Sequence, residues 1–370
     1  VEYPLAMVLA CLCRDVADEP RDARAKKLDI MIPIALGLLM VALLLGGRAV
    51  HSDRAGVAIK MLVAAPLFIN YGFLKRPRRF ALGVGACLIG GSLFGGILGT
   101  TVHVERNFFG VVRVTHDDAG KYVQIAHGTT LHGAQSRDPA RRRDPLVYYS
   151  RTGPLGQVFD AFRAMGSGPK EVGVIGLGAG TMAPYRQPNE TWTYYEIDPA
   201  VISIAENPAY FTYLTDAFPD RDHLRIVLGD ARLRMHDAPD HQYDLIVVDA
   251  FSSDSIPAHL LTREAIALYV SKLAADGFIA VHISNRYLDL EPVFGNLAKD
   301  AKLASRTRRD FDVPQAELDA GKAMSQWLVL APDVAHLGTI QDDARWVETR
   351  TSSQPVWTDD FSNLLSVYRW

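Results

Sequence analysis

The sequence has few cysteines and little net charge. Its three cysteines, Cys11, Cys13 and Cys87, all fall inside apolar segments, so they form neither a disulfide framework nor a spaced set of metal ligands. We therefore expect no metal site. The formal net charge is only −3 over 370 residues, which lacks the basic excess of a nucleic-acid-binding protein. At this length we expect two or three structural units.

Charge is absent from two long segments. Residues 30–47 read IMIPIALGLLMVALLLGG and residues 80–102 read FALGVGACLIGGSLFGGILGTTV, without a charged side chain in either. Each approaches the roughly 20 residues that cross a bilayer core of about 30 Å. Residues 56–74 are also mostly apolar but contain Lys60 and Pro66. Three such segments in a row predict transmembrane helices.

We do not expect the first apolar stretch of the sequence to be a signal peptide. Residues 1–13, VEYPLAMVLACLC, have neither a basic start nor a small-residue cleavage site, and they read as the end of another span. We therefore assign residues 1–103 to the lipid bilayer and expect the chain to be the C-terminal part of a longer membrane protein. Small residues recur every fourth position of the third span, which predicts close packing on other spans or a homo-oligomer; they are Gly83, Cys87, Gly91, Gly95 and Gly99.

From residue 104 the pattern changes to short alternating segments. Residues 104–116 and 122–126 are rich in β-branched side chains and predict a small β domain over 104–150. A helix over 154–165 then precedes strand-like runs that alternate with helices such as 263–273, the pattern of an α/β fold with a parallel, Rossmann-like sheet over 151–335. The predicted strands are 172–175, 193–197, 224–228, 245–248 and 278–283; residues 336–370 form a C-terminal tail.

A glycine turn follows the first of these strands. Gly176, Gly178 and Gly180 permit a tight turn and close approach of a ligand to the backbone. Glu196, twenty residues beyond Gly176 at the end of the second strand, is suited to accept hydrogen bonds from both hydroxyls of a ribose. This pair of signals fits NAD as well as S-adenosylmethionine, and a structural turn with a surface acid would read the same.

Two further acids end strands. Asp230 and Ala231 follow the third strand in the segment LGDA, where a carboxylate could hold an adenine amino group. Asp249 follows the apolar run 245–248 directly, at the edge where open parallel sheets bind ligands. We interpret Asp249 as a carboxylate that faces the pocket.

Together these segments resemble the spermidine synthase family of aminopropyltransferases, and specifically its membrane-fused bacterial relatives, over roughly residues 104–335. HGTTLHGAQ (127–135) is similar to the family's segment that ends on a glutamine, here Gln135. LVYYSRTGPLGQ (146–157) is similar to the gate segment, in which a tyrosine lines the acceptor pocket; Tyr148 and Tyr149 are equivalent candidates. YYEID, GDA and VVDAF occur in the family's order.

The resemblance implies a methyltransferase-type Rossmann fold and the residues of a site. The glycine turn and Gln135 would contact the donor, Glu196 would hold its ribose, and Asp230 with Ala231 its adenine. Asp249, assisted by Tyr149, would take or steer the proton of an attacking amine, because a protonated amine cannot attack carbon. The co-substrate would be S-adenosylmethionine or its decarboxylated form, and methylthioadenosine would leave.

Three positions depart from the family. The glycine loop has Ala179 where the family has an acid, Ser252 stands where a second catalytic-loop acid is expected, and Asp254 follows two residues later. The segment before SQWLVLA also lacks the acceptor-binding tyrosine. These changes reduce the negative charge that would hold a polyamine. The predicted contacts of the acceptor are Tyr148, Ser252 and Asp254.

Other readings stay open. Asp249 could abstract a proton in a lyase reaction, or the donor's own amine could cyclise; methyl transfer, a non-catalytic nucleoside- or polyamine-binding membrane protein and an NAD dehydrogenase fit less well. We interpret His127 and His132 as pocket or turn residues, and not as metal ligands. Asp359 and Asp360 in the tail either close over the pocket or, as we prefer, cap a terminal helix.

Membrane orientation gives conflicting signals. Loops 14–28 and 75–79 are basic, and loop 48–55 has fewer basic residues. Because basic loops tend to stay in the cytoplasm, three spans would place the domain after residue 103 outside it. The chemistry requires a cytosolic co-substrate. We give the chemistry more weight and predict a multi-pass protein of the bacterial inner membrane with a cytoplasmic catalytic domain.

Overall fold

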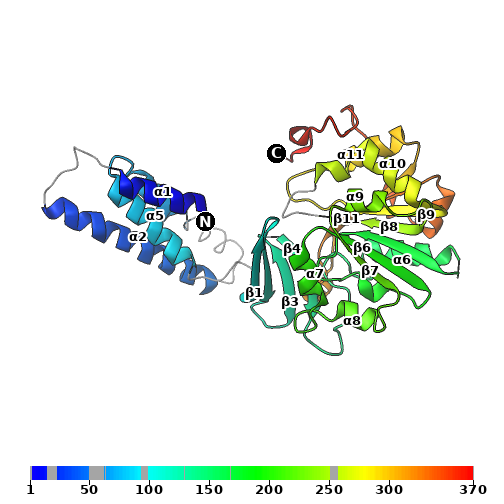
Figure 1. Ribbon diagram of the computed structural model, residues 1–370, viewed down its shortest axis with the longest axis horizontal. Coiled ribbons are helices and arrows are strands. Elements are labelled where there is room, and N and C mark those ends of the chain that lie inside the picture. Colours follow the sequence, from blue (N-terminus) through cyan, green and yellow to red (C-terminus); the bar gives the residue numbers. More distant parts are fainter. Residues whose placement is uncertain are drawn as a thin grey trace. The chain divides into compact units, whose positions relative to one another are not determined.

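The computed structural model describes residues 2–14, 23–49, 62, 64–92, 99–128, 130–166, 168–250 and 257–369. The chain divides into two compact units, Val1–Gly96 and Ile97–Trp370 (Figure 1). The first is helical, and the second contains the two sheets. Each unit is described by itself below.

The N-terminal unit contains one helix in its described part that is long and apolar enough to cross a membrane. This segment, Ala23–Gly46, contains an 18-residue stretch with a mean hydropathy of 2.6 and includes most of the predicted span 30–47. The predicted second span lies partly outside the described residues. The predicted third span is wrong at its end, because Thr100 to Val102 begin a strand and are not helical. The helices are α1 (Glu2–Cys13), α2 (Ala23–Ala49), α4 (Ala65–Tyr71) and α5 (Pro77–Ser92).

Small residues bring α2 and α5 together. A Cβ added to Gly37 of α2 would lie 3.1 Å from the Cβ of Ala86 on α5, and one added to Gly90 would lie 3.2 Å from the Gly37 carbonyl oxygen. Cys87, from the predicted small-residue stripe, is buried against Leu36 and Met40 of α2. This cysteine therefore packs within the unit, as expected for an apolar residue.

The C-terminal unit begins with a four-stranded antiparallel sheet in the order β1-β2-β3-β4. The predicted run 104–116 is a hairpin that turns at Phe108 and Phe109, and its first strand starts at Thr100, four residues earlier than predicted. Alternation buries Val112, Val114 and Ile125 on one face. The strands are β1 (Thr100–Asn107), β2 (Gly110–His116), β3 (Tyr122–His127) and β4 (Thr130–Ser136).

The larger sheet has eight strands in the order β12-β10-β11-β9-β8-β5-β6-β7. Neighbours from β9 to β7 run parallel, which confirms the predicted α/β fold class. The C-terminal strands β10, β11 and β12 pair antiparallel and were not predicted. The strands are β5 (Lys170–Ile175), β6 (Glu190–Glu196), β7 (Leu224–Leu228), β8 (Tyr243–Val248), β9 (Leu273–His282), β10 (Ala304–Asp310), β11 (Ser325–Ala331) and β12 (Val347–Glu348).

Helices cover this sheet and leave one edge open to a ligand. The chain runs from β5 outward to β6 and β7 and then returns to β8, so the strand order reverses between β5 and β8. In open parallel sheets, ligands bind outside the carboxyl ends of the strands at such a point. The α-helices are α6 (Pro154–Ala164), α7 (Pro199–Glu206), α8 (Tyr213–Ala217), α9 (Ala231–His236), α10 (Arg263–Lys272), α11 (Glu291–Asp300) and α12 (Gln315–Asp319). Short 3₁₀ helices are η1 (Ala183–Tyr185), η2 (Ala258–Leu260), η3 (Ala335–Ile340) and η4 (Leu364–Val367).

Candidate active site

The glycine turn after β5 is tight because three elements meet there. Gly176 (φ +98°) and Gly178 (φ +54°) adopt backbone conformations that favour glycine. A Cβ on Gly176 would clash with the Asp249 carbonyl oxygen, and one on Gly178 would lie 2.5 Å from the carbonyl oxygen of His132. Any side chain at these two positions would push β8 or β4 away from the turn.

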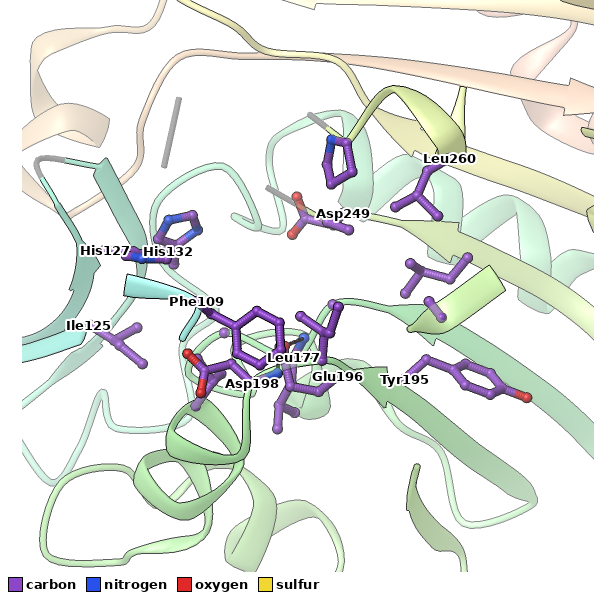
Figure 2. Close-up of a pocket in the computed structure, with 18 of the residues that line it drawn as sticks. Phe109, Ile125, His127, His132, Leu177, Tyr195, Glu196, Asp198, Asp249 and Leu260 are labelled. Carbon is purple, nitrogen blue, oxygen red and sulfur yellow. Dashed lines mark hydrogen bonds between the residues drawn. The ribbon is translucent and has the colours of Figure 1, made fainter. Parts of the chain in front are cut away.

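A pocket opens at this point, with an empty volume of about 890 Å³ that includes its open mouth. Gly176, Gly178, Glu196, Asp230 and Asp249, which come from separate segments of the sequence, all line it. In Figure 2 the rings of His127 and His132 lie side by side on the wall formed by the small sheet, and Phe109 from the β1–β2 turn closes part of the same wall.

Glu196 is fixed by backbone amides at the end of β6. One of its carboxylate oxygens accepts a hydrogen bond from the Leu177 amide at 2.9 Å, and the other accepts one from the Asp198 amide at 2.9 Å. Its burial raises the pKa of the Glu196 carboxyl, although these amides lower it in part. Each oxygen has a second lone pair for a ligand hydroxyl.

Asp230 lies between a helix terminus and a histidine. Its Oδ1 caps α9 by accepting the Leu233 amide at 3.0 Å, and its Oδ2 lies 2.9 Å from Nε2 of His259. Both residues, with Ala231, line the pocket. His259 was not predicted, since an isolated histidine in sequence carries no signal of its partner.

Asp249 is buried just beyond the end of β8. Only 3% of its side chain is exposed. Its Oδ2 accepts a hydrogen bond from the Tyr149 hydroxyl, and its Oδ1 lies 2.7 Å from Nδ1 of His282. A carboxylate has about four lone-pair sites, so two sites stay available to a molecule in the pocket.

Tyr149 reaches Asp249 from a strained segment. Val147, two residues earlier, has φ +50°, which is unusual for a β-branched residue, and it is held by backbone hydrogen bonds with Gly321 and Ala323. Burial first, and then the charge of Asp249, raise the pKa of Tyr149 well above its ordinary value. Tyr149 therefore stays a neutral hydrogen-bond donor.

Comparison with known proteins shows which sequences and structures this chain is similar to. No protein-family model matches the chain. A polyamine aminopropyltransferase from Vibrio vulnificus (strain CMCP6) is 32% identical over 190 residues, which are 50% of this chain and 59% of that protein. The chain thus spans less than two thirds of the length of this curated relative.

The structure of a probable spermidine synthase from Corynebacterium glutamicum ATCC 13032 matches with a TM-score of 0.51 and 15% identity, over 73% of this chain and 99% of that one. A spermidine synthase in complex with the transition-state analogue AdoDATO matches with a TM-score of 0.44 and 16% identity, over 63% and 72%. At 15% identity the Corynebacterium structure shows a common fold alone. This chain is thus similar in sequence to an aminopropyltransferase and in fold to a spermidine synthase.

Several residues that the spermidine synthase resemblance singled out lie elsewhere. Gln135 is absent from the pocket lining. Its amide nitrogen donates to the Arg142 carbonyl and the Thr212 hydroxyl, and its amide oxygen accepts from the Thr212 backbone amide, so it ties β4 to the start of α8. Gly180 turns toward Leu214 and is also absent from the lining. Ser252 and Asp254 lie outside the described residues.

The family departure Ala179 and the gate tyrosine Tyr148 each occupy a defined place in the structure. Ala179 is fully buried, and a Cβ on Gly133 of β4 would lie 2.8 Å from the Ala179 Cβ, so the loop packs closely against the small sheet. Tyr148 lines the pocket with its hydroxyl 3.3 Å from that of Tyr149. Within the described ranges, no group of three or more His, Cys, Asp or Glu is suited to a metal ion.

The tail differs from its predicted role. Asp359 accepts two hydrogen bonds of 2.6 Å from Arg232 on α9 and one of 2.8 Å from Thr262 at the start of α10. Asn363, and not an aspartate, caps the terminal helix η4. The preferred interpretation of Asp359 as a helix cap is therefore wrong, because its carboxylate pairs with Arg232, in the same surface hollow as Asp230.

Proposed function

We propose that the chain is an aminopropyltransferase-like enzyme. It would take S-adenosylmethionine or its decarboxylated form as donor, transfer an aminopropyl-type group to a small amine, and release methylthioadenosine. The observation that carries this proposal is the convergence of Glu196, Asp230 and Asp249 on one pocket beside the turn at Gly176 and Gly178.

The adenosyl part would bind along the first two acids. Glu196, fixed by two amides, would accept the ribose hydroxyls. Asp230 and the Ala231 backbone would meet the adenine, and His259 would orient the Asp230 carboxylate through their 2.9 Å contact. Phe109 and Ile197 add apolar surface to the same pocket, as suits an aromatic base.

Asp249 would act on the nucleophile. The amine nitrogen attacks the carbon next to the sulfonium, a carbon–nitrogen bond forms, and the carbon–sulfur bond breaks with its electron pair on sulfur. Sulfur becomes a neutral thioether, and the extra proton on nitrogen passes to Asp249. Tyr149 would hold one oxygen of this carboxylate, and Tyr148, beside it on the pocket wall, would contact the amine; Ser252 and Asp254 remain predicted contacts of the amine.

A lyase or cyclase is a second proposal, favoured by the donor-tail side of the pocket. Ala179, buried beside the lining residue Gly178, carries no charge, and His127 and His132 line the nearby wall. This side of the pocket repels the carboxylate of intact S-adenosylmethionine less than an acidic loop would. Without an external amine, Asp249 would take a proton in an elimination, or the donor's own amine would attack.

We further propose that the N-terminal helices anchor the chain in the bacterial inner membrane as a multi-pass unit, with the catalytic domain in the cytoplasm where the donor is available. The apolar segment Ala23–Gly46 supports insertion. The packing of α5 on α2 through Gly37 and Ala86 supports a helical bundle.

One experiment tests the reaction. The full chain, purified in detergent, is incubated with either form of the donor, with and without putrescine, and all products are identified by mass spectrometry. Methylthioadenosine with an aminopropylated amine is the expected result. Methylthioadenosine without an acceptor would select the lyase or cyclase, and S-adenosylhomocysteine would show methyl transfer. No turnover of either donor would refute the proposed function.

A further inference from the structure

His282, at the end of β9, is buried behind the carboxylate that faces the pocket. It is only 4% exposed, and its Nδ1 lies 2.7 Å from Oδ1 of Asp249. Its sequence context, FIAVHIS, is that of an ordinary buried strand. The pairing arises from the parallel register of β8 and β9, which sets Val248 opposite Val281 and so brings the next residues of both strands together.

The contact with Asp249 places a hydrogen on Nδ1 of His282. Nδ1 lies 2.7 Å from Oδ1 of Asp249, and this oxygen only accepts while Asp249 is a carboxylate, so Nδ1–H donates to it. On the other side of the ring, the Ser284 hydroxyl accepts the Gln326 amide at 2.7 Å and has two acceptors within reach of its own hydrogen, the Gln326 carbonyl at 3.4 Å and Nε2 of His282 at 2.7 Å. The shorter contact is the one with Nε2, which agrees with a hydrogen on Nδ1.

Aromatic stacking holds the ring in this plane. Tyr148 stacks on one side with ring centroids 4.2 Å apart and an interplanar angle of 21°, and Trp327 of β11 stacks with centroids 4.8 Å apart at 27°. Trp327 is fully buried. An imidazole clamped between two rings cannot swing away from Asp249 without disturbing the β9–β11 pair.

We propose that His282 is a positioning residue for Asp249. Its Nδ1–H fixes Oδ1 while Tyr149 fixes Oδ2, so the carboxylate presents its two remaining lone pairs to the pocket in one orientation. The inference rests on the proposed function, since it assigns the support of the proposed base. The other titratable groups at this pair are Tyr149 and Tyr148, and burial first raises the pKa of both, which keeps them neutral.

A matched pair elsewhere in the chain provides the control. Nδ1 of His336 lies 2.7 Å from Oδ1 of Asp333, the same atoms and the same distance as in the buried pair. Both residues lie outside the pocket lining, and Asp333 is largely exposed. Replacing His336 therefore removes an equivalent hydrogen bond with no connection to the reaction.

Kinetics of three variants test the role. His282→Leu removes the donor and should lower kcat for methylthioadenosine release roughly 10- to 100-fold, as loss of an orienting partner does at metal ligands, with KM for the donor within a few-fold. His282→Asn keeps an N–H near the Nδ1 position and should restore most of kcat. His336→Leu should leave kcat unchanged. Wild-type kcat in His282→Leu, or a His282→Asn variant as slow as His282→Leu, would overturn the proposal.

A spectroscopic measurement tests the hydrogen bond without turnover. In the full chain labelled with ¹⁵N-histidine, two-dimensional imidazole spectra should show His282 with a protonated Nδ1, and Asp249→Asn should shift that signal. A protonated Nε2 with a bare Nδ1 would overturn the proposal. If the wild-type chain releases no methylthioadenosine at all, the proposed function fails, whereas the imidazole spectrum still decides whether His282 holds Asp249.

Discussion

Asp249→Asn separates the charge of the proposed base from its shape. The amide has the same size, so its oxygen still accepts from Tyr149, and its NH₂ group faces Nδ1 of His282. The imidazole adapts by moving its proton to Nε2, where Ser284 accepts it. Because hydrogen bonds to charged groups contribute about 1.5–3 kcal/mol and neutral ones about 0.5–1.5 kcal/mol, weakening two bonds costs about 2 kcal/mol. Relief of a buried charge offsets part of this cost.

The effect on turnover should be larger than the effect on folding. General base catalysis contributes about 10²- to 10⁴-fold to a rate, which is a barrier increase of roughly 3–5 kcal/mol. Methylthioadenosine release, followed by chromatography, should fall by that factor. Affinity for methylthioadenosine, measured by calorimetry, should stay within a few-fold, because Glu196 and Asp230 are untouched.

Two outcomes would refute this reasoning. Turnover near the wild-type rate would remove Asp249 from the chemistry. A loss of turnover with an equal loss of methylthioadenosine affinity would instead make Asp249 a binding residue, since a base acts on the transition state and not on the bound nucleoside. Thermal unfolding of the variant checks that it is folded in both cases.

Three further predictions follow from single contacts. Because burial raises the pKa of Glu196, methylthioadenosine affinity should decline as pH falls toward that raised value, and Glu196→Gln should bind weakly and without this pH dependence, measured by calorimetry. Gly178→Ala should lower the free energy of unfolding by at least roughly 1–2 kcal/mol, the cost of a left-handed backbone at a non-glycine residue, and so lower the melting temperature. Gly168→Ala, where an added Cβ meets open space, should leave the melting temperature unchanged. Asp359→Ala should cost about 1 kcal/mol, since the Asp359 side chain is 44% exposed although its contact with Arg232 has two hydrogen bonds, and limited proteolysis should cut the freed tail sooner.

The strands of the parallel sheet could be predicted because their signals are local. Residues 224–228 coincide with β7, and 245–248 lie within β8, since an apolar run bounded by turns leaves few alternatives. The antiparallel strands β10 to β12 went unpredicted because their order depends on long-range pairing. The end of the third apolar segment was misread for a similar reason: Thr100 to Val102 are uncharged, but β2 pairs with them.

The site residues show the same difference between local signals and long-range contacts. Glu196 and Asp230 were singled out from the sequence because each follows a strand, and both line the pocket through contacts with their own neighbouring backbone. Gln135 was assigned to the donor through resemblance, but its amide bonds to Thr212 and Arg142, and it is absent from the pocket lining. His282 and His259 were missed because their partners lie 33 and 29 residues away in the sequence.

This division bears on which reaction such a fold performs. The proposed nucleoside half of the pocket, around Glu196 and Asp230, is held by backbone amides and a helix cap, which depend on the path of the chain. The proposed reactive half depends on side chains from three separate segments: Tyr149 before α6, Asp249 after β8 and His282 on β9. A substitution at any one of them would alter the proposed acid–base chemistry and leave the residues around Glu196 in place. Reaction type should therefore vary with the residues around Asp249, while donor binding follows from the turn at Gly176.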